Sequence, residues 1–324
     1  KPAVCLFGGE PTVREDLFDI IRMCRSYGMR ARVFTNGLKL ADEEYCRRLT
    51  KTRAELLISY DGADAETYAV LRGTCKVLEL KRKAIENVGK LGNVGRRRVT
   101  IVSVISKGLN DEVIPELLEF CHSRRQFIGT LYLMPLCHTW DTADWDFDPE
   151  RITTEGVEAL VNDAFPEHEV EFLPLGFVHQ FGTLMRSIGK EPLPYGAHPN
   201  CESIYFLVSD GEKYVPVGHY LRGSVLDLGN TFMKLEKRLA ARVERWKTSL
   251  RGRMLSAVHL KQAALKMRGL GALMLFLTRH VRFGRFLKGR GLTKLLHAIL
   301  LPIEIVLRRG TSKEIRRHTN AQGH

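Results

Sequence analysis

The stretch AVCLFGGEPTVRED, residues 3 to 16, brings an apolar run directly to two glycines, a glutamate and a proline. The run from Ala3 to Phe7 predicts a strand buried on both faces, because such strands are continuously apolar. Glycine lets another molecule approach the backbone, and proline restricts the shape of the turn. The stretch therefore predicts either a ligand-binding turn at the end of a parallel strand or a plain tight turn.

Strand and helix patterns alternate through the first 136 residues. The predicted strands are 3–7, 31–34, 55–59, 98–105 and 131–136, with helical patterns between them. This alternation predicts an α/β fold of parallel βαβ units. Polar residues follow the strands, and their side chains are expected to converge on one rim: Glu10, Asn36, Ser59 and Asp61.

Charge divides the chain into a mildly acidic body and a basic tail. The net charge is +13, but residues 231–324 alone hold 22 Lys and Arg against 4 Asp and Glu. We expect three parts: an α/β core over 1–136, an extension with a β-hairpin over 137–230, and a basic amphipathic helical tail over 231–324. Seven dispersed cysteines form no disulfide pattern, which favours a reducing, cytoplasmic setting.

Four short motifs at successive strand ends resemble those of the radical S-adenosylmethionine (radical SAM) superfamily. They are Gly8-Gly9-Glu10-Pro11, Thr35-Asn36-Gly37, Ser59-Tyr60-Asp61-Gly62 and Leu71-Arg72-Gly73. The resemblance covers about residues 1–136 and implies a partial (β/α)6 TIM-like barrel. It implies an enzyme that uses S-adenosylmethionine and a 4Fe-4S cluster to generate a 5′-deoxyadenosyl radical, with ferredoxin or flavodoxin as a possible type of electron donor.

The same resemblance assigns residues to the cofactor. It implies that the Gly8-Gly9-Glu10-Pro11 turn binds the amino group of S-adenosylmethionine through Gly8, Gly9 and Glu10. It implies that Ser59 and Asp61 lie near the ribose or the substrate and that Arg72 holds the cofactor's carboxylate; Asn36 shares the rim. Plain turn chemistry is the alternative for Asn36 and Asp61, and a surface ion pair is the alternative for Arg72. No residue is assigned as catalytic.

The chain departs from the family at the cluster motif. The family holds its cluster with three cysteines spaced C-x3-C-x2-C, and no cysteine spacing here fits. That motif normally precedes the glycine-rich strand, so we expect the first strand and the cluster loop to lie upstream of Lys1. The chain as written is expected to be inactive. A true cluster-less relative, acting as a non-catalytic S-adenosylmethionine-binding or scaffold protein, is the alternative.

A narrower resemblance reaches about residue 225. GGEPTVREDLFDIIRMCRSYGM, KAIENVGKLG, VISKGLND and HPNC are similar to the branch of tetraether lipid synthases and pterin methyltransferases. The branch implies modification of an unactivated carbon on a lipid chain. Methylation or a related modification of a heterocycle or RNA is the alternative. Members can carry auxiliary clusters, so Cys201 is a candidate cluster ligand or a buried structural cysteine; Cys121, Cys137 and His198 are weak candidates for its partners.

The basic tail interleaves arginines and lysines with apolar residues. Basic helices with an apolar face lie at anionic membrane surfaces, which favours peripheral attachment at the inner face of the membrane. RNA binding would use the same charge, and a solvated helical appendage is the remaining interpretation. The apolar run 295–306 is too short to span a bilayer comfortably.

Overall fold

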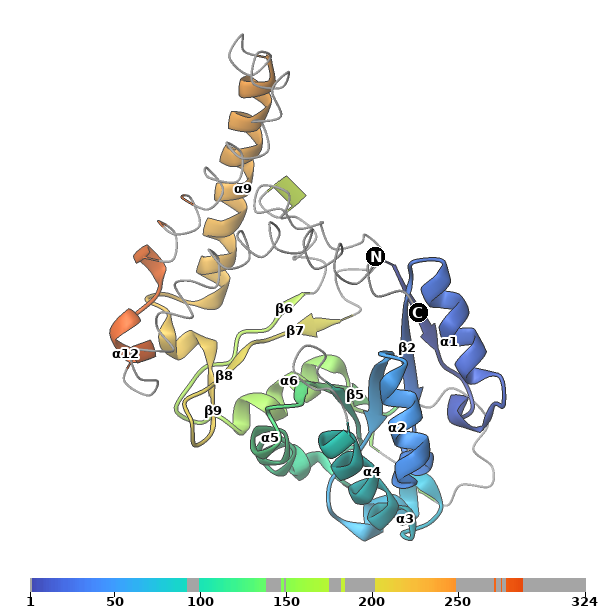
Figure 1. Cartoon of the computed structure of the whole chain (residues 1–324). Helices are drawn as coiled ribbons and strands as arrows, with labels where there is room; N and C mark the ends of the chain where they lie inside the picture. The colour runs from blue at the N-terminus through green and yellow to red at the C-terminus, as the bar shows by residue number, and fades with distance from the viewer. Residues whose placement is uncertain are drawn as a thin grey trace. The chain divides into compact units, whose positions relative to one another are not determined.

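The five predicted strands form one parallel sheet in unbroken chain order (Figure 1). This computed structural model describes residues 2–91, 99–137, 147–148, 150–174, 182–183, 202–248, 271, 275 and 278–287. The chain divides into one unit over Lys1–Pro166 and a second over Glu167–His324. The three-part division predicted from the sequence stays a prediction.

The first unit holds the sheet and its connecting helices. Its strands are β1 (Ala3–Leu6), β2 (Arg30–Thr35), β3 (Glu55–Ser59), β4 (Val99–Ile105) and β5 (Ile128–Pro135). The α-helices are α1 (Leu17–Ser26), α2 (Glu43–Lys51), α3 (Ala65–Arg72), α4 (Val77–Leu91), α5 (Ile114–Ser123) and α6 (Thr154–Asp163). Short 3-10 turns are η1 (Pro11–Val13), η2 (Leu38–Ala41) and η3 (Asp111–Val113).

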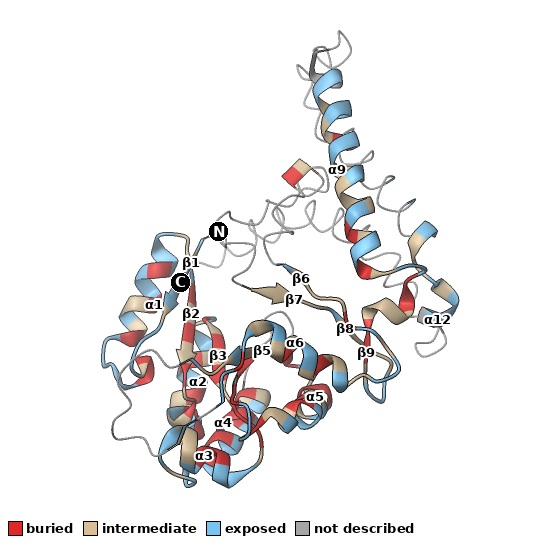
Figure 2. Ribbon diagram, turned by 180° about the vertical axis from the view of Figure 1, so that it is seen from behind, coloured by how far each residue is buried: buried red, intermediate tan, exposed pale blue. Residues whose placement is uncertain are grey.

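Parallel register puts side chains of neighbouring strands on the same face of the sheet. Val33 pairs with Leu56, and Ile58 pairs with Ile101; all four are buried. Helix α4 covers this face, because a Cβ on Gly37 would meet both Ile58 and Ala84. The buried residues, red in Figure 2, follow the strands and the helix sides that pack against them. This layer is the core that fixes the strand ends.

The opposite face of the sheet is less covered. Phe34, Leu57 and Tyr132 are half-buried there, and Met134 is exposed. Five parallel strands in chain order, with helices on one face and a more open second face, are consistent with an incomplete TIM-like barrel. The predicted α/β class is therefore confirmed.

The prediction that the strand from Ala3 to Phe7 is buried on both faces was wrong: Cys5 and Phe7 are exposed, because β1 is an edge strand that pairs with β2 alone. Some element boundaries also differ from the sequence prediction. Strand β5 begins at Ile128 rather than at residue 131, because Val99 already pairs with Ile128 before a register shift in β4. Helix α1 begins at Leu17, since Pro11 starts a separate 3-10 turn. Helix α2 is capped by Asp42, whose carboxylate accepts from the backbone N–H of Tyr45.

The second unit contains two small antiparallel sheets and helices. Its elements are β6 (Leu173–Pro174), β7 (Ser203–Ile204), β8 (Leu207–Ser209), β9 (Tyr214–Pro216), η5 (Val217–Tyr220), α9 (Val225–Thr248) and α12 (Phe283–Leu287). The predicted hairpin is β8–β9 with Asp210-Gly211 in its turn, although its first strand is interrupted after Ile204. Within the described ranges, no helix is both long and apolar enough to cross a membrane.

Candidate functional site

The glycine turn lies at the carboxyl end of β1. Gly8 and Gly9 have φ values of +97° and +42°, and both are exposed. No heavy atom lies within 4 Å of a Cβ built on either residue. Within the described part of the chain, no N–H donates to the carbonyl oxygens of Gly8 or Gly9. The turn therefore presents open backbone acceptors to a ligand.

The carboxylate of Glu10 ties this turn to β2. Its Oε1 accepts from the backbone N–H of Thr12 at 3.0 Å, from the Thr12 hydroxyl at 2.6 Å and from the Thr35 hydroxyl at 2.7 Å. Its Oε2 accepts from the backbone N–H of Asn36 at 2.6 Å. Because Oε1 carries three of the four bonds, Oε2 is the oxygen that retains acceptor capacity. Glu10 thus positions the turn and leaves negative charge beside the open carbonyls.

The carboxylate of Asp61 ties β3 to β4. Its side chain is fully buried; Oδ1 accepts from the backbone N–H of Val104 at 2.9 Å. Oδ2 accepts from Nε and Nη2 of Arg72, at 3.0 and 2.8 Å. The hydroxyl of Tyr68 accepts from the N–H of Asp61 and donates to the carbonyl of Gly62, both at 3.0 Å. Burial raises the pKa of Tyr68, so this hydroxyl keeps its proton.

A lysine ties β2 to β3. The ammonium of Lys81, on α4, donates to the carbonyl of Asn36 at 2.8 Å. It also donates to the carbonyl of Ser59 at 2.8 Å and to the hydroxyl of Ser59 at 2.7 Å. The residue is 1% exposed. The three junctions between the first four strands are therefore each bridged by an ionisable side chain.

The structure brings most of the predicted site residues to this carboxyl edge. Gly8, Gly9, Glu10, Asn36 and Ser59 lie at the ends of β1, β2 and β3, and Pro11 is buried at the start of η1. Asp61 and Arg72 pair with each other. The contacts of these residues with a cofactor stay predictions.

Sequence reasoning missed Lys81 and Tyr68, and it assigned no role to Thr35, which belongs to one of the four motifs. Lys81 had a detectable signal: Leu78, Lys81, Ile85 and Val88 follow the spacing of one helix face, and the other three are apolar. A cation at a core position of that pattern predicts a specific buried partner.

The described cysteines do not fit an iron–sulfur cluster. Within the described residues, no three His, Cys, Asp or Glu side chains are grouped to hold a metal. Burial raises the pKa of Cys46 to about 11 and that of Cys121 to about 12, which disfavours the thiolate form that cluster ligands take. Cys137 is exposed, with its thiol 3.6 Å from the carbonyl of Pro135. Cys201 and His198 lie outside the described residues.

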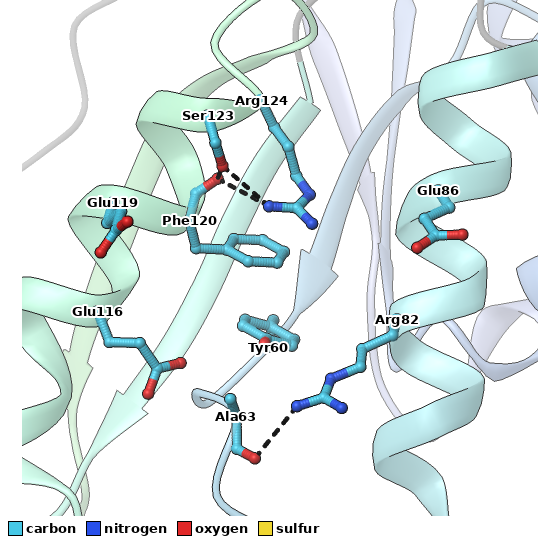
Figure 3. A pocket seen from close by; sticks show the side chains of 9 residues that line it. All are labelled: Tyr60, Ala63, Arg82, Glu86, Glu116, Glu119, Phe120, Ser123 and Arg124. Atoms are coloured by element: carbon cyan, nitrogen blue, oxygen red, sulfur yellow. Dashed lines mark hydrogen bonds between the residues drawn. The ribbon is translucent and has the colours of Figure 1, made fainter. Parts of the chain in front are cut away.

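A separate pocket lies in the helical layer between α4 and α5 (Figure 3). It measures about 330 Å³. The rings of Tyr60 and Phe120 stack at 4.4 Å, and the guanidinium of Arg124 lies 4.1 Å from the Phe120 ring. Side chains of both signs surround this stack: Arg82, Glu86, Glu116 and Glu119. None of the predicted cofactor residues lines the pocket, although Tyr60 and Ala63 on its wall come directly after β3.

Comparison with known proteins identifies the N-terminal part. Residues 1–121 match a family model described as the Radical SAM superfamily. The chain is 27% identical, over 68% of its own length, to a 7,8-dihydro-6-hydroxymethylpterin dimethyltransferase from Methanocaldococcus jannaschii. It is 33% identical, over 40% of its length, to a GTP 3',8-cyclase from Marinobacter nauticus. The matches cover 44% and 38% of those proteins, so the chain spans less than half the length of these relatives.

One solved structure, that of TYW1 with a lysine-pyruvate adduct bound, is also similar. It shares 18% identity and a TM-score of 0.37, over 53% of this chain and 52% of that one. The matched segment 1–121 contains β1 to β4 and the bridged carboxyl edge described above. This segment is therefore a radical SAM superfamily domain.

Proposed function

We propose that the carboxyl edge of the sheet binds S-adenosylmethionine and that the protein is a radical SAM enzyme modifying an unactivated carbon. The observation that carries the proposal is the turn after β1. Within the described residues, no N–H donates to the carbonyls of the two exposed glycines, and the Glu10 carboxylate fixes the turn through its bonds to Thr35 and Asn36. An ammonium needs such acceptors and is favoured by the adjacent negative charge.

The chain's own residues have defined roles in this proposal. The carbonyls of Gly8 and Gly9 accept from the cofactor's amino group, and Glu10 orients them. The hydroxyl of Ser59 is placed to donate to the ligand. In the superfamily, S-adenosylmethionine and its 4Fe-4S cluster supply a carbon radical that abstracts hydrogen. Because the described cysteines do not fit that cluster, no step through it is assigned to these residues.

Two substrate classes follow from different observations. The pterin dimethyltransferase matches 68% of the chain, which supports methylation of a small heterocycle. The basic tail supports an apolar chain at a membrane, but most of that tail lies outside the described residues. Mass analysis of products from the whole protein, with a pterin and with an isoprenoid lipid, separates the two classes. A methylated heterocycle supports the first, and a carbon-modified lipid supports the second.

Substitution of Gly8 tests the cofactor site. Gly8→Ala places a side chain at φ +97°, so the turn must change shape even though there is space for the methyl group. We expect equilibrium dialysis to show at least about tenfold weaker binding of S-adenosylmethionine, equivalent to about 1.4 kcal/mol.

Gly28→Ala is the matched control. Gly28 has φ +71° and equally open surroundings, but it precedes β2 at the amino edge of the sheet. It should cost similar stability and leave the affinity unchanged. Absence of binding by the unmodified protein, or equal affinities of all three proteins, would contradict the proposal.

A further inference from the structure

The ammonium of Lys81 is matched by its acceptors one for one. Its three hydrogens face three oxygens: the carbonyl of Asn36, the carbonyl of Ser59 and the hydroxyl of Ser59. All three acceptors are neutral groups. A buried cation without a directly bonded carboxylate is uncommon, since desolvation penalises its charge.

Charged groups on the neighbouring elements surround this ammonium without bonding to it. Asp61 follows β3, Glu10 follows β1 and Arg72 ends α3, while the ring of Tyr68 on α3 lies 5.8 Å from the nitrogen. The pKa of Lys81 is lowered to about 8, mainly by burial; Arg72 adds to this shift, whereas Asp61 and Glu10 oppose it. The ordinary pKa of a lysine side chain is about 10.4.

The state of Lys81 determines what the Ser59 hydroxyl can do. When Lys81 is charged, the Ser59 oxygen accepts from it, and the hydroxyl hydrogen has no acceptor within the described residues. Neutral Lys81 has only two hydrogens and one lone pair. Two hydrogens can serve the two carbonyls, and the lone pair then faces the hydroxyl of Ser59. That hydroxyl must turn its hydrogen toward Lys81.

We propose that Lys81 is a positioning residue whose protonation decides whether Ser59 can donate a hydrogen bond to the ligand at the carboxyl edge. This inference rests on the proposed binding of S-adenosylmethionine there. When Lys81 is charged, the Ser59 hydroxyl can donate its hydrogen to the ligand. When Lys81 is neutral, the hydroxyl donates to the Lys81 nitrogen instead. Ligand affinity therefore falls as pH rises through about 8.

Loss of folding does not account for the same pH dependence. Between pH 8 and the ordinary lysine pKa, Lys81 is neutral in the folded chain and charged in the unfolded chain. The unfolded state then binds more protons, so the Lys81 contribution to the free energy of unfolding rises with pH. A fall in affinity over this range is opposite in sign to the stability change.

Affinity for S-adenosylmethionine, measured by equilibrium dialysis at pH 7 and pH 9, tests the proposal. We expect the full chain to lose about tenfold in affinity, the equivalent of one hydrogen bond. Ser59→Ala and Lys81→Met should bind more weakly at pH 7. Between pH 7 and pH 9 they should lose less affinity than the unmodified chain, keeping only the part that comes from titration of the ligand's own amino group. Lys83→Met, which alters an exposed lysine on the same helix, should keep the pH dependence of the unmodified chain.

A second measurement separates this proposal from the binding proposal. Carbon-13 NMR of the lysine Cε atoms, assigned with Lys81→Met, follows the Lys81 proton without any ligand. A midpoint near pH 8 that moves in Ser59→Ala supports the coupling. A midpoint near the ordinary lysine pKa overturns it, as does a pH dependence of affinity that is as large in Ser59→Ala as in the unmodified chain. Failure to bind S-adenosylmethionine at any pH contradicts the proposed function. In that case the NMR midpoint still tests whether the Lys81 proton is coupled to the Ser59 hydroxyl.

Discussion

Two carboxylates, those of Asp61 and Glu10, link neighbouring strands at the carboxyl edge of the sheet. They differ in burial and in how far hydrogen-bond donors of the protein occupy their oxygens. Asp61 is fully buried, and a backbone N–H and the two nitrogens of Arg72 occupy its oxygens. Glu10 is half-buried, and three of its four bonds crowd onto Oε1. The β3–β4 end is therefore a closed structural junction, whereas the β1–β2 end retains an acceptor beside open backbone carbonyls.

Removal of Asp61 should have the largest effect on stability. Asp61→Ala leaves the Arg72 guanidinium and the Val104 N–H without their acceptor. Leaving these donors without their charged acceptor costs about 1–3 kcal/mol, and we expect a decrease near the upper end of that range in the free energy of unfolding by urea, because solvent reaches Arg72. Asp64→Ala is the matched control: its exposed carboxylate caps α3, and the loss of a cap costs about 1 kcal/mol. Equal losses in the two variants would show that Asp61 is not a structural junction.

Neutralising Glu10 should affect affinity more than stability. Glu10→Gln keeps the side-chain length but removes the charge that strengthens four hydrogen bonds. We expect about 1 kcal/mol lower stability by urea and about tenfold weaker binding of S-adenosylmethionine by dialysis. Glu15→Gln, at an exposed position of the next turn, should change neither quantity. Loss of stability with unchanged affinity would show that Glu10 holds the turn in place but does not contribute to ligand binding.

The sequence predicted the sheet because its strands follow simple rules. Strands buried on at least one face, such as 55–59, are strongly apolar, and the polar residues after them mark the carboxyl edge. The boundary of β5 was missed because Ile128 and Gly129 precede the apolar run, and only pairing with Val99 places them in the strand.

Side-chain direction at the edge could not be predicted in the same way. Glu10 and Asp61 both follow strands, yet one ends half-buried and the other fully enclosed. This difference depends on Tyr68, Arg72 and Val104, which come from two other elements. Lys81 was missed because a lysine in a helical pattern is normally solvent-exposed. Only the packing of α4 against the ends of β2 and β3 gives it three buried acceptors.

Arg72→Lys should have the smallest effect on stability. It decides whether Arg72 holds the cofactor's carboxylate or only pairs with Asp61. Lysine keeps the charge but replaces two nitrogens on one oxygen of Asp61 with a single donor. The Arg72 side chain is 34% exposed, so solvent screens the pair, and we expect a decrease of only about 1 kcal/mol in the free energy of unfolding. Added salt should reduce this difference. If affinity for S-adenosylmethionine falls while stability does not, Arg72 holds the cofactor's carboxylate, as the family resemblance implied. If stability alone falls, its guanidinium belongs to the closed junction with Asp61.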